Sequence, residues 1–96
     1  MHAVVRTYSG AGARELFDTL EERKDDIRAT LQKVTGLVSY TLFRQGDGGM
    51  SVMVCADKAG TDESLSVARD WIRNNAPNTT ASAPAVTEGT VIVQIT

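Results

Sequence analysis

Residues 37–56, LVSYTLFRQGDGGMSVMVCA, decide the fold of this chain. The segments 37–44 and 50–56 are rich in valine, aromatic and other residues that favour strands. The glycine-rich segment between them, 45–49, is typical of a hairpin loop. Because a hairpin places its two strands side by side, this stretch predicts two antiparallel neighbours in a sheet.

The flanking sequence predicts a strand and a helix before the hairpin and a helix and a strand after it. Residues 3–8 favour a strand, and the apolar residues of 13–34 recur at gaps of three, four and seven, which fit the helical period. Thr61 or Asp62 is expected to cap the second helix. The last strand is expected at 90–95.

These elements follow the order βαββαβ. Since each βα unit returns through a right-handed crossover, the compact arrangement is a four-stranded antiparallel sheet of order 4-1-3-2 with both helices on one face. The sequence therefore predicts an α+β fold of the ferredoxin-like type. Residues 1–96 are expected to form one domain, in which the polar stretch 78–82 is a flexible connection.

Composition argues against several classes of function. The net charge is −2 and the basic residues are dispersed, whereas a nucleic-acid surface usually shows a basic patch. No apolar stretch approaches the roughly 20 residues that a membrane helix needs, so no membrane contact is expected. The N-terminal residues lack the pattern of a signal peptide, and a single cysteine fits a reducing cytoplasm. One cysteine and one histidine exclude a zinc site built mainly from these residue types, and no metal or cofactor is expected.

The hairpin register predicts which side chains share a face of the sheet. With Arg44 opposite Met50 and Tyr40 opposite Val54, these side chains would lie beneath the helices. The other face would then carry a large apolar patch formed by Val4, Tyr8, Phe43, Met53 and Ile92, together with Arg6. Exposed patches of this kind mark interfaces, so a homodimer through this sheet face is expected.

The second half of the chain carries the clearest family likeness, in ARDWIRNN at 68–75 and PAVTEG at 84–89. Together with the element order, these segments make the chain resemble the dimeric α+β barrel superfamily, and within it an uncharacterised branch related to the antibiotic biosynthesis monooxygenase domain. The resemblance implies a dimeric barrel. It leaves the reaction open, because the superfamily includes cofactor-free oxygenases, haem-degrading enzymes, decarboxylases and proteins with no known activity.

The haem-degrading pattern of that superfamily is absent from this sequence. It requires an Asn on the first strand, a Trp on the third strand and a His on the second helix, and none of these is present. Trp71 lies on the expected second helix instead. The resemblance therefore does not imply a haem substrate.

Five residues are candidates for a site, and each has a structural alternative. Tyr40 and Trp71 are both expected between sheet and helices, where they would line a pocket or simply pack in the core. Arg6 and Tyr8 would bind an anionic ligand in the barrel or pair with a carboxylate of the partner chain. His2, the sole histidine, is a possible acid or base, or an inert group at a frayed terminus.

Two hypotheses of function follow from these residues and the resemblance. The first is a dimeric barrel that binds or transforms a small organic molecule, by a monooxygenase-like reaction that needs no cofactor. The alternative is a non-catalytic ligand-binding or purely structural dimer. The sequence assigns no catalytic residue, and it interprets the charged face of the first helix, which includes Glu21 and Arg28, as a solvated surface.

Overall fold

The computed structural model describes residues 1–76 and 83–96. Its elements, in chain order, are β1 (His2–Tyr8), α1 (Ala13–Glu22), α2 (Lys24–Leu31), β2 (Leu37–Gln45), β3 (Gly48–Cys55), α3 (Lys58–Asn75) and β4 (Ala85–Thr90). The connection expected at 78–82 lies outside the described residues.

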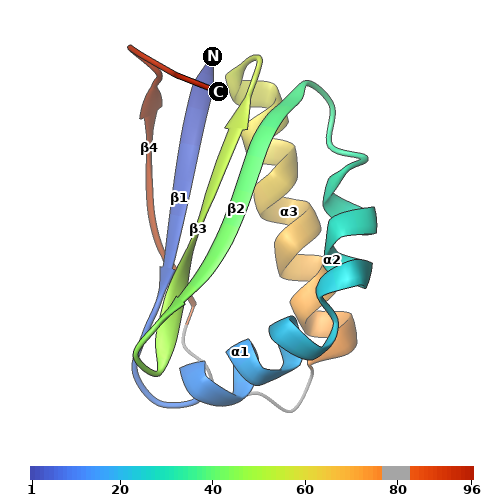
Figure 1. Ribbon diagram of the computed structural model, residues 1–96. Coiled ribbons are helices and arrows are strands. Elements are labelled where there is room, and N and C mark those ends of the chain that lie inside the picture. Colours follow the sequence, from blue (N-terminus) through green and yellow to red (C-terminus); the bar gives the residue numbers. More distant parts are fainter. Residues whose placement is uncertain (77–82) are drawn as a thin grey trace.

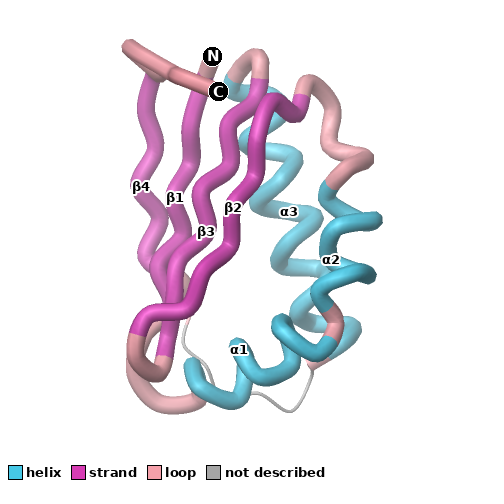
Figure 2. Tube along the Cα trace, viewed as in Figure 1, coloured by secondary structure: helices cyan, strands magenta, loops and turns pink. Residues whose placement is uncertain are grey.

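The sheet has the strand order β2-β3-β1-β4, and all three neighbouring pairs are antiparallel. The helices cover one side of the sheet and leave the other side bare (Figure 1). The same two layers are visible in Figure 2, with the strands in magenta and the helices in cyan. The predicted ferredoxin-like fold, including the strand order 4-1-3-2, is confirmed.

The first helical segment is two helices and not the single helix predicted over 13–34. The break lies at Arg23, whose backbone angles, φ −107° and ψ 25°, are not helical. The apolar stripe itself was predicted correctly, since Leu16, Phe17, Leu20 and Ile27 are all buried. Between Leu20 and Ile27 the stripe has no apolar residue to hold the chain against the sheet, and the break occurs in this interval.

The cap of helix α3 lies four residues before Thr61, the earlier of the two predicted caps. Asp57 caps it, with its Oδ1 accepting a hydrogen bond from the Gly60 backbone N–H at 3.2 Å. Thr61, one of the two predicted caps, lies inside the first turn and donates its hydroxyl to the Lys58 carbonyl at 3.0 Å. Several residues of capping type lie close together here, and neither of the two predicted residues, Thr61 or Asp62, is the cap.

The hairpin register differs by one residue from the prediction. The loop is a two-residue turn at Gly46 and Asp47, so Gln45 pairs with Gly48 and Tyr40 pairs with Met53. Gly46 has φ 59°, and glycine at the first central position is typical of a type II′ hairpin turn. The predicted five-residue loop was too long because Gly48 and Gly49 belong to the strand.

This slip inverts the two faces of β3 relative to the prediction, and β1 is inverted with it. The side chains predicted to form an exposed interface are therefore buried beneath the helices: Val4, Arg6, Tyr8, Ser51, Met53 and Cys55. On the bare side, Val5 and Val52 face each other across the strand pair, both half-buried. Phe43 also lies on this side, as predicted, and is 43% exposed.

The last strand is β4, at Ala85–Thr90, and not the predicted 90–95. Its neighbour β1 supplies the backbone partners, with Val5 opposite Thr87, so strand composition alone did not decide the position. After β4 the chain turns across the end of the sheet (Figure 1). There Val91 donates its N–H to the Met1 carbonyl at 3.0 Å, and the Gln94 amide donates to the Ser39 hydroxyl at 3.3 Å.

Candidate functional site

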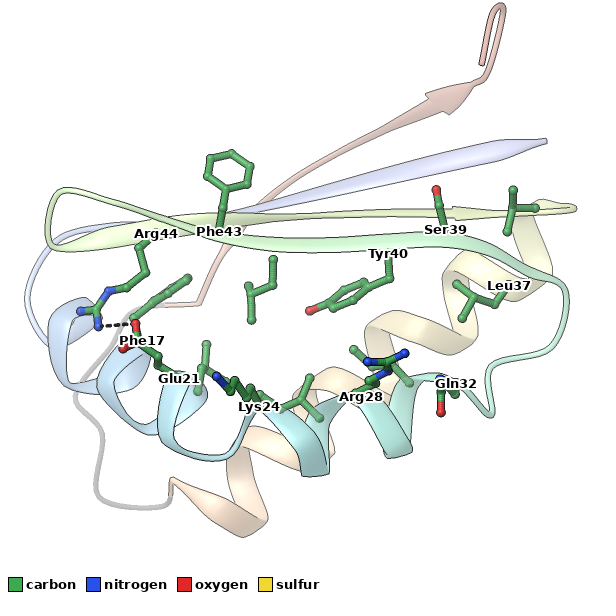
Figure 3. A pocket seen from close by; sticks show the side chains of 15 residues that line it. Phe17, Glu21, Lys24, Arg28, Gln32, Leu37, Ser39, Tyr40, Phe43 and Arg44 are labelled. Carbon is green, nitrogen blue, oxygen red and sulfur yellow. Dashed lines mark hydrogen bonds and ion pairs between the residues drawn. The ribbon is translucent and has the colours of Figure 1, made fainter. Parts of the chain in front are cut away.

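A cavity of about 590 Å³ lies between β2 and the helices α1 and α2. Its walls are largely apolar, and Leu20, Ile27, Leu31, Leu42 and Phe17 contribute to them. Tyr40 projects from β2 toward the helices, whereas Ser39 and Phe43 point to the opposite side of the sheet (Figure 3). The volume is within the range of about 300–1,000 Å³ that is usual for small-molecule sites.

A second, smaller pocket of about 30 Å³ lies deeper between sheet and helices. Its lining includes Arg6, Tyr8, Ser51, Tyr40 and Trp71. The two cavities share five lining residues: Leu20, Ile27, Leu31, Tyr40 and Leu42. The wide cavity therefore borders this smaller pocket, called the inner end below, which is lined by a few polar side chains and has room for about one water-sized molecule.

Arg6 is the main polar group of this inner end. It is only 3% exposed, its Nε donates to the Ser51 hydroxyl at 3.0 Å, and its Nη1 lies 3.5 Å from the Ser64 carbonyl. Among the residues that the structure describes, no carboxylate forms an ion pair with it. A buried charge normally has an ionic partner, so this guanidinium retains a strong preference for an anion.

The two tyrosines of the inner end stay protonated at neutral pH. Burial raises the pKa of Tyr40 above its ordinary value of 10.0, and the nearby positive charge of Arg6 opposes this rise. Burial likewise raises the pKa of Tyr8, again with Arg6 acting in the opposite direction. Tyr8 also packs edge-on against Phe17, with ring centroids 5.8 Å apart. Both hydroxyls are thus available as hydrogen-bond donors and are poor bases.

Trp71 is fixed at the wall of the inner pocket by contacts from the α1–α2 junction. Its indole Nε1 donates to Asp26 Oδ2 at 2.7 Å, and the Arg23 guanidinium carbon lies 5.9 Å from the ring centroid. Arg23 and Asp26 in turn form an ion pair at 3.6 Å. The junction that breaks the helix therefore also orients the sole tryptophan of the chain.

His2 does not belong to this site. Its Nδ1 lies 2.8 Å from the Thr61 hydroxyl and its Nε2 lies 3.5 Å from Glu88, and it lines neither cavity. The expected fraying is also wrong, because His2 is part of β1 and its side chain is only 14% exposed. Cys55 is fully buried, and burial raises the pKa of its thiol, with Glu63 and Asp57 acting in the same direction.

The structure therefore brings four of the five predicted residues together: Arg6, Tyr8, Tyr40 and Trp71. Sequence analysis placed the first two on the wrong face of the sheet. It also missed Lys24 and Arg28, which extend from α2 along the helical wall of the wide cavity (Figure 3). Their four-residue spacing on one side of a helix was the signal for a shared surface, but the break between α1 and α2, both of which line the cavity, was not predicted.

The described ranges 1–76 and 83–96 contain no group of three or more His, Cys, Asp or Glu side chains that could hold a metal ion. In the same ranges, no helix has both the length and the apolar character required to span a membrane.

Comparison with known proteins yields matches in structure only. No family model matches the chain, and neither does any curated protein sequence. The solved structure of a protein of unknown function from Nitrosomonas europaea, NE2512, superposes with a TM-score of 0.70 at 18% identity, over 99% of this chain and 91% of that one.

Two further structures connect the fold with oxygenases. A putative antibiotic biosynthesis monooxygenase from Chloroflexus aurantiacus has a TM-score of 0.64 at 16% identity, over 99% of this chain and 96% of that one. The chain has the antibiotic biosynthesis monooxygenase-like fold. A monooxygenase from Streptomyces coelicolor, the product of ActVA-Orf6 solved with the ligand nanaomycin D, has a TM-score of 0.63 at 16% identity, covering 99% and 90% of the two chains. At these identities the comparison establishes the monooxygenase-like fold and not the reaction.

Proposed function

We propose that this protein binds a small aromatic molecule in the cavity between β2 and α1–α2 and oxygenates it without a metal or nucleotide cofactor. The observation that carries the proposal is the buried Arg6, which has no carboxylate partner in the described part of the chain and lines the small pocket that borders the apolar cavity. The fold shared with a monooxygenase that binds nanaomycin D supports the same reaction class.

The chemistry of such a reaction requires a substrate that supplies its own electrons. An anthrone is one example, because loss of a proton from its ring CH2 gives an electron-rich enolate that reduces molecular oxygen directly. One oxygen atom then forms a new bond to that carbon and the other leaves as water, so the CH2 group becomes a ketone. The atoms and electrons balance without an external reductant.

The site stabilises the anion formed in this first ionisation, and the proton passes to solvent water. A guanidinium close to an acidic group favours the ionised form of that group, and the effect is larger for a buried guanidinium such as that of Arg6 than for an exposed one. Tyr8 and Tyr40 line the same pocket with neutral hydroxyls that can donate hydrogen bonds to a developing oxyanion. We therefore assign ionisation of the substrate to Arg6 and the two hydroxyls, with no histidine involved.

The test is oxygen consumption with a dihydroxyanthrone as probe, measured with an oxygen electrode alongside formation of the anthraquinone. The wild-type chain is expected to accelerate both, and Arg6→Met is expected to lose about 100-fold or more of this rate, the usual effect of removing one oxyanion-stabilising group. Arg69→Met removes an exposed arginine that lines neither cavity and serves as the matched control. Equal rates for wild type and Arg6→Met would refute the proposal.

The alternative is a non-catalytic ligand-binding protein with the same cavity. It is favoured by one observation: Glu21 is the one carboxylate in either cavity lining, it pairs with Arg44, and neither lining contains an imidazole. Binding of the anthrone, seen as quenching of Trp71 fluorescence without any oxygen consumption, would decide for this alternative.

We also propose that the protein forms a homodimer through the bare side of the sheet. The predicted patch was wrong in most of its members, but this side still presents Val5, Val52 and the exposed Phe43. The segment after β4 adds Ile92, Val93 and Ile95, which are 94%, 76% and 92% exposed. Apolar groups exposed to this extent are typical of a surface covered by a partner.

A further inference from the structure

Side chains separate the wide cavity from the inner end. The residues that line both form this partition, and two of them, Ile27 and Leu31, belong to α2. The inner end has a volume of about 30 Å³, whereas the wide cavity has about 590 Å³. A ligand in the wide cavity therefore reaches Arg6 only when side chains of the partition move apart.

Of the three helices, α2 has the fewest attachments to the sheet. A hydrogen bond from Arg44 to Asp18, at 3.0 Å, ties α1 to β2, and a contact of 2.8 Å between His2 and Thr61 ties α3 to β1. Within residues 1–76 and 83–96, no side chain of α2 forms a hydrogen bond or ion pair with a strand. Across the wide cavity, α2 faces β2 (Figure 3).

The chain is fixed on both sides of α2. The Arg23 N–H donates to the Thr19 carbonyl at 2.9 Å and so closes the end of α1, while the non-helical angles of Arg23 set α2 apart. After α2, Val34 is buried, and the Gly36 carbonyl accepts a hydrogen bond from the Ala56 N–H at 2.8 Å. A change of backbone angles at Arg23 can therefore move α2 without disturbing α1 or the sheet.

A single side-chain hydrogen bond links α2 to another helix in the described part of the chain. It runs from the Trp71 indole Nε1 to Asp26 Oδ2 at 2.7 Å. Trp71 belongs to α3 and lines the inner end, so this bond holds α2 against a wall of that pocket. Arg23, at the break, pairs with Asp26 and lies 5.9 Å from the centre of the Trp71 ring, so three groups meet at the start of α2.

We propose that α2 is a gate, hinged at Arg23, that moves away from α3 to connect the wide cavity with Arg6, and that Asp26 holds the gate closed. This inference rests on the proposed function and adds a conformational step to it. Opening withdraws Ile27 and Leu31 from the partition. Closing restores the bond between Asp26 and Trp71 and shields the bound group from water, as closing elements commonly do at such sites.

The test is the rate at which dihydroxyanthrone quenches Trp71 fluorescence after rapid mixing under nitrogen, where oxygenation cannot follow. Asp26→Ala is expected to raise the association and dissociation rate constants together, by about fivefold for the loss of one half-exposed hydrogen bond, because the bond stabilises the closed gate in both the free and the bound protein. The dissociation constant is then expected to change less than about twofold, since the two effects cancel.

Two variants serve as controls. Asp26→Asn keeps a carbonyl oxygen that can accept from the indole, and it is expected to restore rates near those of wild type. Asp25→Ala removes the same charge from an exposed position of α2 and should bind at wild-type rates. If Asp26 only maintained the shape of the site, Asp26→Ala would speed dissociation without speeding association, and that result would overturn the gate.

A measurement without ligand separates this inference from the proposed function. Absence of quenching by dihydroxyanthrone in wild type would refute the proposed site, and acrylamide would then test the gate alone. Trp71 is 8% exposed in the closed structure, so Asp26→Ala is expected to raise its quenching constant with acrylamide by about twofold over wild type and Asp25→Ala. Equal constants in all three proteins would overturn the gate.

Discussion

At the scale of single residues, the buried charge of Arg6 lowers the stability of the fold and favours the binding of the proposed ligand. Its guanidinium is buried against Ser51 and the Ser64 carbonyl, and no described carboxylate compensates its charge. Taking such a group out of water is unfavourable even when it is hydrogen-bonded. Active sites commonly retain strained or unpaired groups that a more stable protein would lack.

The first prediction follows from this cost. Removing both partners in Arg6→Met/Ser51→Ala is expected to raise the melting temperature by about 4–8 °C, which corresponds to roughly 1 kcal/mol in a domain of this size. Thermal unfolding followed by circular dichroism measures the change. A lower melting temperature than that of wild type would show that the guanidinium stabilises the fold.

The second prediction concerns the hydrogen bond between Trp71 and Asp26. Asp26→Ala is expected to destabilise the protein by about 1 kcal/mol, a modest value because the carboxylate is half-exposed, and to shift Trp71 emission to longer wavelength. Urea unfolding followed by fluorescence gives both quantities. Asp25→Ala, an exposed neighbour with no contact to the indole, should leave them unchanged.

At the scale of elements, β3 shows how far sequence could predict the fold and the site. The order of elements was predictable because each has a strong period or composition. The face of β3 was not, because Met50, Val52 and Val54 on one side are as apolar as Met53 and Cys55 on the other. Alternation therefore left the choice to the register of the hairpin, and a register shift of one residue moved Arg6 and Tyr8 from the predicted interface to the side of the sheet beneath the helices.

The glycines of the hairpin explain the error in turn length. A side chain at Gly49 would collide with the ring of Phe17, and one at Gly48 would collide with the Tyr8 backbone. Both positions need glycine for close packing within the strand. In sequence the same residues are indistinguishable from a loop signal. Trp71 and Tyr40 escaped this ambiguity, since their placement depended on the helical stripe and on the β2 face that the slip did not change.

The third prediction uses another close approach, that of α3 to β3. A Cβ at Gly60 would lie 2.8 Å from the Cys55 Cβ, so Gly60→Ala is expected to cost about 1–3 kcal/mol of unfolding free energy through overpacking. Chemical denaturation measures it. At Gly89 nothing lies within 4 Å of the added atom, and Gly89→Ala is the control that should differ little from wild type.

The fourth prediction concerns the bare side of the sheet. Val52→Glu introduces a charge at its centre and is expected to convert a dimer into a monomer without unfolding it, because Val52 is not beneath the helices. Sedimentation velocity over a range of concentrations reports the association state. Ser66→Glu places the same charge on an exposed position of α3 and should leave the dimer intact. A wild-type chain that is monomeric at all concentrations would refute the proposed interface.

At the scale of the whole molecule, the two buried tyrosines couple folding to alkaline pH. Both have a pKa raised above 10.0 in the folded state, chiefly by burial, so above this pH the folded state binds more protons than the unfolded state does. The contribution of these two tyrosines to the free energy of unfolding is therefore complete below pH 10 and is lost as the pH rises through their folded-state pKa values. Urea midpoints measured across this range should decline in wild type and decline less in Tyr40→Phe, in which one of the two groups is absent.

The break at Arg23 makes α2 a helix separate from α1, and two sides of α2 serve different purposes. Ile27 and Leu31 attach this short helix to the core, while Lys24, Arg28 and Gln32, each one turn from the next, face the cavity. Because α2 is separate from α1, the residues at positions 24, 28 and 32 can be substituted without altering the sheet or α1. The chemical preference of the cavity is therefore free to diverge among proteins with this fold while their cores stay alike, and combinatorial libraries at positions 24, 28 and 32 offer a direct way to redesign the ligand.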